Sequence, residues 1–178
     1  MAKQKIVPSL WFDKNCEEAI NYYVKVFNGA PHSKKNPASP AGRSKIISIT
    51  RYEKGMQTPE IEEMVGKVIT AIFELAGQRF MALDGGPIFK FNEAISFYVE
   101  CEDQKEVDYF WDKLSASPEN EQCGWVKDKF GLSWQIIPKQ LGKLLMDKDK
   151  EKALRVMNAM LKMKKIVVAD LEKAAEGK

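Results

Sequence analysis

The two halves of this chain follow one plan, in which corresponding features lie 88 positions apart. This spacing relates Asn15 to Asp103, Glu18-Ala19 to Glu106-Val107 and Tyr22-Tyr23 to Phe110-Trp111. The second half closes with the run Cys123–Pro138, which predicts a β-hairpin that ends in a buried strand. Two similar halves predict a duplicated, barrel-like fold.

The first half predicts a strand, a helix and three further strands. Apolar residues recur at helical spacing between Cys16 and Phe27, where Asn15 suits the N-cap and Gly29 suits the C′ position. The predicted strands are Ile6–Phe12, Lys45–Tyr52, Val68–Leu75 and Gln78–Asp84, with Ala76-Gly77 as a tight turn between the last two.

The second half repeats this order with a short or missing third β element. Its predicted elements are strand Ala94–Glu100, helix Lys105–Leu114 after the N-cap Asp103, and strands Gln122–Lys127 and Leu132–Ile137. Each module, about 5–87 and 92–138, has too few strands to close a core alone. The modules must therefore pair, either within one chain or across a dimer.

Two other segments are expected outside the repeated plan. Glu53–Gly66, with Pro59 and four glutamates, predicts a loop or short helix. Residues 139–178 predict a helical appendix that packs on the sheet or on a partner, because apolar residues such as Leu141, Leu144 and Leu145 recur at helical spacing. The expected fold class is α+β, with paired βαβββ modules that form a curled, barrel-like sheet.

Three segments carry a resemblance to a known family. The run Cys123–Pro138, with Phe80–Pro87 and Phe89–Glu93, resembles the PhnB-like branch of the vicinal-oxygen-chelate superfamily, which includes glyoxalases, bleomycin-resistance proteins and dioxygenases. Members of this branch often carry the label 3-demethylubiquinone-9 3-methyltransferase. The resemblance covers nearly the whole chain and implies a ligand cavity formed by curled sheets, but it leaves the reaction open.

The resemblance also implies where a metal ion would bind. Metal-dependent relatives carry ligands on the first and last strands of each module, and the matching first-strand positions here are Pro8 and Ser96. Proline cannot be a ligand and serine is a poor one for transition metals. The last-strand positions offer only Gln135 and Asp84, which are too few for a tight site. We therefore expect no metal and no cofactor.

The candidate ligand site is the face of the strands that lines the cavity in relatives. Since side chains alternate along a strand, one face carries Pro8, Leu10 and Phe12, another Ser96, Tyr98 and Glu100, and a third Ser133, Gln135 and Ile137. A mostly apolar wall with a few polar groups suits a small organic molecule, although the same residues could simply fill a barrel. The candidate ligand-binding residues are Phe12, Asp84, Ser96, Tyr98, Trp125, Trp134 and Gln135.

Individual candidates have competing interpretations. Glu100 is the candidate catalytic residue, as a general base on an inward face, or it ends its strand in solvent. Trp125 and Trp134 flank the Asp128 turn and serve either core packing or ligand stacking. The segment Asp84–Pro87 predicts a turn.

The chain lacks the signatures of several other functions. It has no Gly-x-Gly-x-x-Gly or Walker motif, no Gly-rich strand-to-helix loop for a methyl donor, and one histidine, His32, in a polar loop. The net charge of +3 comes from basic residues after Lys139 that alternate with acidic ones and include no aromatic side chain, which argues against nucleic-acid binding. Without a long apolar run or signal peptide, and with three widely spaced cysteines, we expect a cytoplasmic protein that does not enter a membrane.

Two functions remain. The first is metal-independent binding or sequestration of a small organic molecule in a central cavity by a homodimer. The second is an enzyme. One form of it is a lyase, isomerase or oxygenase of the superfamily, which uses Glu100 or Asp84 as acid or base, or which binds a metal through residues that the predicted strands misplace. The other form is the methyltransferase that the label names, which the sequence supports poorly.

Overall fold

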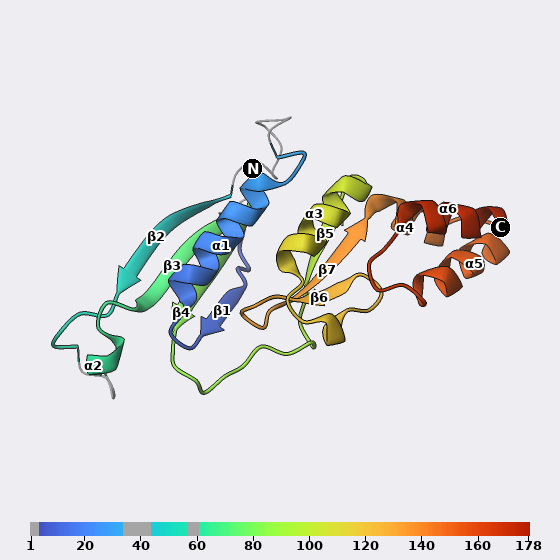
Figure 1. Cartoon of the computed structure of the whole chain (residues 1–178). Coiled ribbons are helices and arrows are strands. Elements are labelled where there is room, and N and C mark those ends of the chain that lie inside the picture. The colour runs from blue at the N-terminus through green and yellow to red at the C-terminus, as the bar shows by residue number, and fades with distance from the viewer. Residues whose placement is uncertain (1–3, 34–43, 57–60) are drawn as a thin grey trace. The chain divides into compact units, whose positions relative to one another are not determined.

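The structure, a computed structural model, describes residues 4–33, 44–56 and 61–178. The chain divides into two compact units, Met1–Phe91 and Asn92–Lys178, and the second unit includes the C-terminal helices (Figure 1). In the part described, no helix combines the length and apolar character needed to cross a membrane.

The first unit contains the predicted strand, helix and three strands. Its sheet has the order β1-β4-β3-β2, in which β1 runs parallel to β4 and the other neighbours are antiparallel. The elements are β1 (Ser9–Phe12), α1 (Cys16–Gly29), β2 (Lys45–Arg51), the short α2 (Ile61–Met64), β3 (Val68–Leu75) and β4 (Gln78–Asp84).

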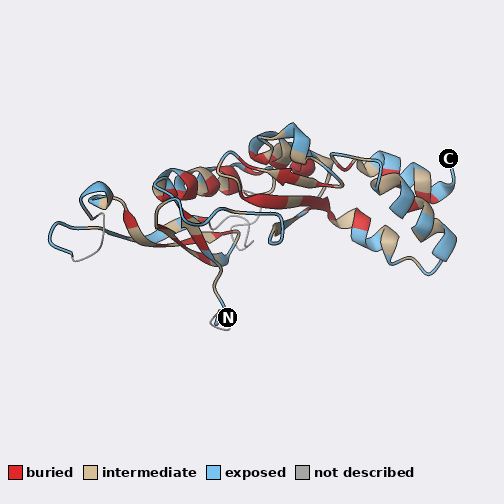
Figure 2. Cartoon of the chain, turned by 90° about the horizontal axis from the view of Figure 1, so that it is seen from below, coloured by how far each residue is buried: buried red, intermediate tan, exposed pale blue. Residues whose placement is uncertain are grey.

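Helix α1 covers one face of this sheet. Its buried residues recur every three or four positions and pack toward β2, β3 and β4: Cys16, Ala19, Ile20, Tyr23, Val26 and Phe27. Figure 2 shows this inner side of the helix as buried, with its other side exposed. Gly29 is the last helical residue, and the chain turns to extended backbone at Ala30, so the predicted C′ glycine is wrong.

The start of α1 is held by a side chain from β4, the last strand of the unit in sequence. Asn15 is the N-cap residue, as predicted, but its side chain makes no cap hydrogen bond. Instead, the buried Asp84 carboxylate at the end of β4 accepts from Cys16 N (2.8 Å) and from Val68 N at the start of β3 (3.0 Å). One carboxylate thus joins three elements.

The second unit has a three-stranded sheet of order β5-β7-β6, as the short or missing third β element predicts. Its elements are β5 (Phe97–Cys101), α3 (Gln104–Leu114), a 3₁₀ turn (Pro118–Asn120), β6 (Trp125–Lys127) and β7 (Ser133–Pro138). Asp103 caps α3 as predicted, by accepting from Glu106 N. The predicted strand from Gln122 is wrong at its start, because Cys123 and Gly124 both have positive φ and form a tight turn before β6.

A second buried aspartate fixes the β6–β7 turn. The Asp128 carboxylate accepts from the backbone N–H of Phe130 (2.8 Å) and Leu132 (3.0 Å), and from the indole of Trp134 (2.8 Å). Both sheets are open, with an edge strand at each side. The pairing of the modules into a curled sheet, within a chain or across a dimer, stays a prediction.

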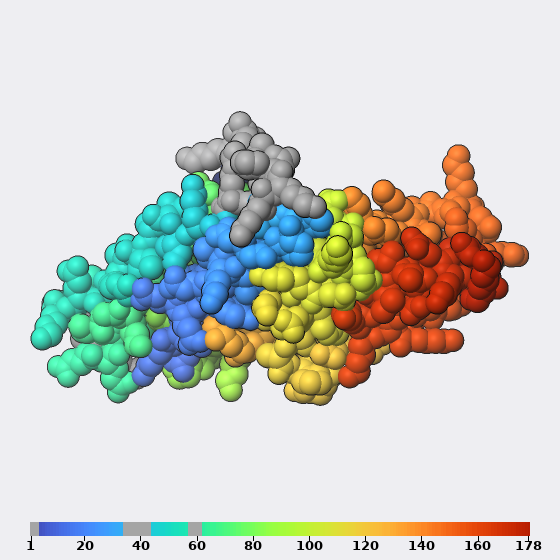
Figure 3. Space-filling model, turned by 45° about the horizontal axis from the view of Figure 1, so that its top comes forward, coloured from blue at the N-terminus to red at the C-terminus, as the bar shows by residue number. Residues whose placement is uncertain are grey.

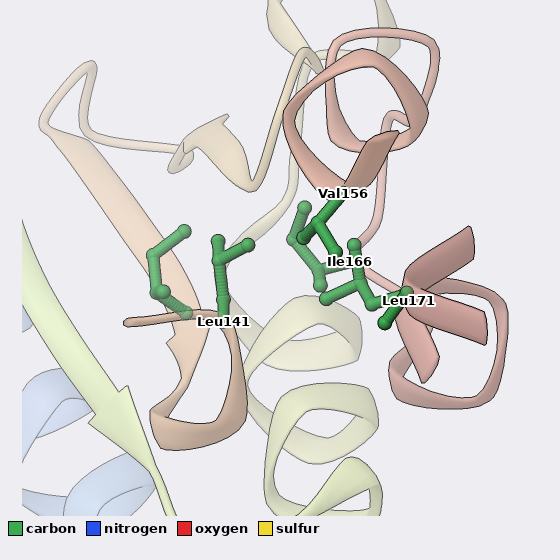
Figure 4. Close-up of a cluster of buried hydrophobic side chains, with 6 residues drawn as sticks. Leu141, Val156, Ile166 and Leu171 are labelled. Carbon is green, nitrogen blue, oxygen red and sulfur yellow. The ribbon is translucent and has the colours of Figure 1, made fainter. Parts of the chain in front are cut away.

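The appendix consists of α4 (Lys139–Leu145), α5 (Lys150–Met160) and α6 (Val168–Glu176). These helices pack on the end of the second unit's own sheet, around a cluster of Ile137, Leu141, Val156, Ile166, Leu171 and Ala175 (Figure 4). The backbone N–H groups of Cys123 and Gly124 donate to the carbonyls of Met163 and Lys164. In Figure 3 these C-terminal helices, coloured from orange to red, lie beside the yellow part of the same unit.

We predict that Asp84→Ala lowers the free energy of unfolding by about 2–4 kcal/mol, because two buried backbone N–H groups lose their acceptor. The check is the denaturant midpoint, compared with Asp112→Ala, whose side chain is exposed on α3. The control should change stability by less than about 0.5 kcal/mol. Equal, small effects of the two substitutions would contradict the role assigned to Asp84.

Candidate functional site

Four of the predicted ligand-binding residues meet on one face of the second sheet. Tyr98 on β5 lies opposite Gln135 on the central strand β7, and Gln135 lies opposite Trp125 on β6. Register partners point to the same side of a sheet, so these three side chains form a row across all three strands. We call Tyr98, Gln135 and Trp125 the cross-strand row.

A hydrogen bond fixes the centre of the row. Gln135 Nε2 donates to Ser96 Oγ at 2.8 Å, which brings the fourth predicted residue onto the same face. Gln135 is half-buried, whereas Tyr98 at the margin is 56% exposed. The row therefore has a partly buried polar centre with an aromatic ring on each side.

Glu100 lies on this face too, one alternation beyond Tyr98, and its register partner is Ile137. Its side chain is exposed, which agrees with the interpretation that it ends its strand in solvent. Burial, followed by the nearby Glu100 carboxylate, raises the pKa of Tyr98 above its ordinary value, so Tyr98 is a neutral phenol at neutral pH.

The opposite face of the sheet carries α3 and contains Trp134. This indole is 2% exposed, donates to Asp128, and lies with its ring centroid 5.6 Å from that of Phe97. Of the two interpretations offered for Trp134, the structure favours core packing. Trp125 lies on the other face of the sheet, beside Gln135.

Phe12 and Asp84 belong to the first unit and face its helix. They are register partners, and the Asp84 carboxylate contacts the start of α1, so both lie on the helix-covered side of the sheet. Phe12 thus lies on the helix-covered face of its sheet, whereas Tyr98 and Glu100 lie on the face of theirs that α3 leaves open. The two first strands differ by one residue relative to their helices, and a shift of one residue exchanges the two faces of a strand.

A depression of about 380 Å³ lies beside Asp84, at the start of α1. Its lining is mostly charged: Lys14, Asn15, Glu17, Glu18, Gly66, Lys67, Val68 and Asp84. Because the Asp84 oxygens already accept from Cys16 N and Val68 N, this carboxylate supports the local fold rather than offering free acceptors.

Trp11 is the residue on the open side of the first sheet that sequence reasoning missed. Its indole N–H donates to Gly86 O (2.9 Å), and its ring packs edge-on against Phe89 at 5.0 Å. A Cβ at Gly85 would lie 2.2 Å from this ring. The Gly85-Gly86 pair after a predicted strand was the available signal, because paired glycines often mark close approach of a bulky group.

The side chains described do not gather as a metal centre would require. In residues 4–33, 44–56 and 61–178, no three His, Cys, Asp or Glu residues form a group that could hold an ion. The Ser96 hydroxyl is engaged with Gln135. The expectation of a metal-free site stays a prediction.

Comparison with known proteins places the chain in a family. The model for 3-demethylubiquinone-9 3-methyltransferases matches residues 4–137. The chain is 33% identical to a PhnB protein from Bacillus cereus, described as a 3-demethylubiquinone-9 3-methyltransferase, with a TM-score of 0.56 over 76% of this chain and 99% of that one. A protein from Pseudomonas aeruginosa shares the fold at 18% identity, with a TM-score of 0.54 over 76% of this chain and 98% of that one. No curated protein matches.

We predict that Gly85→Ala destabilises the protein by about 1–3 kcal/mol, because the new methyl group displaces the Trp11 ring. Gly142→Ala is the matched control: it lies inside α4 with no atom near its added Cβ, and should stabilise by about 0.5–1 kcal/mol. Both values come from chemical denaturation. If the two variants shift stability in the same direction, the close approach of Trp11 to Gly85 is not a constraint on the fold.

Proposed function

The chain belongs to the 3-demethylubiquinone-9 3-methyltransferase family, whose members include PhnB-like proteins, and we propose that it binds a small organic molecule without a metal ion. The proposed site is the open face of the second sheet. The cross-strand row is the observation that carries the proposal, because it presents two aromatic rings around one oriented amide. Such a combination of apolar surface and few polar groups suits a small ligand.

Methyl transfer, the activity in the family name, would need a site for a methyl donor. The glycines Gly85 and Gly86 follow β4, but the chain continues from them into irregular backbone and not into a helix. They therefore do not form the strand-to-helix loop that binds such a donor in doubly wound enzymes. This favours binding over methyl transfer.

The proposal includes a homodimer in the cytoplasm. Free cysteines at positions 16, 101 and 123 agree with a reducing compartment. Edge strands on both sheets and exposed apolar residues of the appendix, such as Leu154 and Leu161, are surfaces on which a second copy could pack.

We predict that Gln135→Leu keeps the fold but abolishes thermal stabilisation by ligands. A ligand at 100 times its Kd stabilises by about 2.7 kcal/mol, and losing a buried hydrogen-bond partner costs about 1–3 kcal/mol of that. The measurement is a thermal-shift screen of small aromatic compounds against wild type, followed by the variant.

Gln78→Leu is the control, since Gln78 is exposed on β4 of the first unit. Hits that stabilise Gln135→Leu as well as wild type would reject the site. For the alternative of an enzyme, Glu100→Gln should remove turnover of an identified substrate while its affinity stays the same; retained turnover would reject Glu100 as the base.

We also predict that protein purified without chelator contains far less than one equivalent of divalent metal, because Pro8 and Ser96 occupy the expected ligand positions. Elemental analysis provides the measurement. A content close to one zinc, nickel, manganese or iron per chain would contradict a metal-independent site.

A further inference from the structure

We propose that the ligand of the open face carries a positively charged nitrogen next to a flat ring, with Glu100 as its counter-ion and Gln135 Oε1 as its hydrogen-bond acceptor. This inference rests on the proposed binding function and names the class of ligand: an arylalkylamine in its ammonium form. Its basis is the hydrogen-bond polarity, the charge and the spacing of the groups on this face.

The polarity of the row is set by Ser96. A glutamine amide offers donors on Nε2 and an acceptor on Oε1. Because one N–H of Nε2 donates to Ser96 Oγ, the amide is held in one orientation, which presents Oε1 and the second N–H to a ligand. The acceptor Oε1 at the centre of the face pairs with an N–H or O–H group.

The charge on the face favours a positively charged ligand. Glu100 lies on the same side of β5 as Tyr98, and its exposed carboxylate has no ion pair among the residues described. Lys127 pairs with Glu93, and Lys139 pairs with Glu102. The pKa of Lys139 is raised by its hydrogen bond to Glu102 and, to a smaller extent, by the charge of Glu100. Glu100 thus has no direct ion-pair partner among the residues described, and Lys139 is a cation within its electrostatic reach.

The aromatic side chains of the row suit contact with one flat group. Tyr98 and Trp125 stand on the two strands that flank β7, so their backbones are about 10 Å apart at the usual strand spacing, and the Gln135 side chain stands between them. A flat ring therefore packs over the amide and against one of the two aromatic side chains. A cation within about 6 Å of either ring is also attracted by the aromatic face.

The test uses three soluble probes that share an indole ring and a two-carbon arm: tryptamine as a cation, tryptophol as a neutral alcohol and indole-3-propionate as an anion. Binding to the full-length protein at neutral pH is measured by calorimetry. We expect tryptamine to bind about tenfold tighter than tryptophol, and the propionate to bind weakest. Glu100→Gln should remove most of the preference for tryptamine and leave tryptophol binding unchanged.

Glu172→Gln, an exposed position on α6, is the matched control and should keep the full preference. Equal or tighter binding of the propionate, a preference for tryptamine that survives Glu100→Gln, or no binding of tryptamine to wild type would each overturn the inference. These outcomes leave the proposed function to the separate test with the compound library and Gln135→Leu, so the two failures are distinguishable.

Discussion

The fold depends on two buried carboxylates that accept hydrogen bonds from the backbone. Asp84 joins the start of α1, the start of β3 and the end of β4, while Asp128 holds the β6–β7 turn and the indole of Trp134. A carboxylate taken out of water is costly unless its oxygens are satisfied, so each one also specifies the positions of its donors. Each half contains one such carboxylate, but at a different place. In the first half it binds the start of the helix, and in the second half it binds the turn before the last strand.

Local patterns were enough to predict most elements. The bounds of β3 and β4 follow from alternation on either side of Ala76-Gly77, where positive φ at both residues makes the tight hairpin turn. Asp103 was recognisable as a cap because its donor, Glu106 N, lies three residues away. The cap of α1 was not, since Asp84 comes from 68 residues further along the chain. The turn at Cys123-Gly124 was likewise missed, because it lies inside the predicted strand Gln122–Lys127.

For the candidate site, too, patterns between near neighbours in sequence could be predicted, and contacts between distant residues could not. Alternation placed Ser96, Tyr98 and Gln135 on common faces, and the register of β7 with both neighbours brought them together with Trp125. Phe12 faces its helix, whereas Tyr98 faces away from α3. The reason is that the 88-residue offset relates the two helices correctly but is wrong by one residue for the first strands of the two halves. It also could not separate Trp125 from Trp134: a neighbouring aspartate and Phe97 decide that Trp134 belongs to the core. The signal for Trp11 was also distant, since it lay in the Gly85-Gly86 pair after β4.

The contacts between the Cys123-Gly124 turn and residues 163–164 have a consequence for how the protein is made. The first unit is complete by Phe91, so it can fold while the ribosome is still producing the second. The second unit is different, because Gly124 N–H donates to Lys164 O, and the Gln104 side chain bonds Ile166 and Val168 in addition to Asp108 on its own helix. This unit is therefore closed only after residues 164–168 have been made. A premature stop codon before residue 164 would release a chain with one finished half and one open half, a natural substrate for chaperones and proteases.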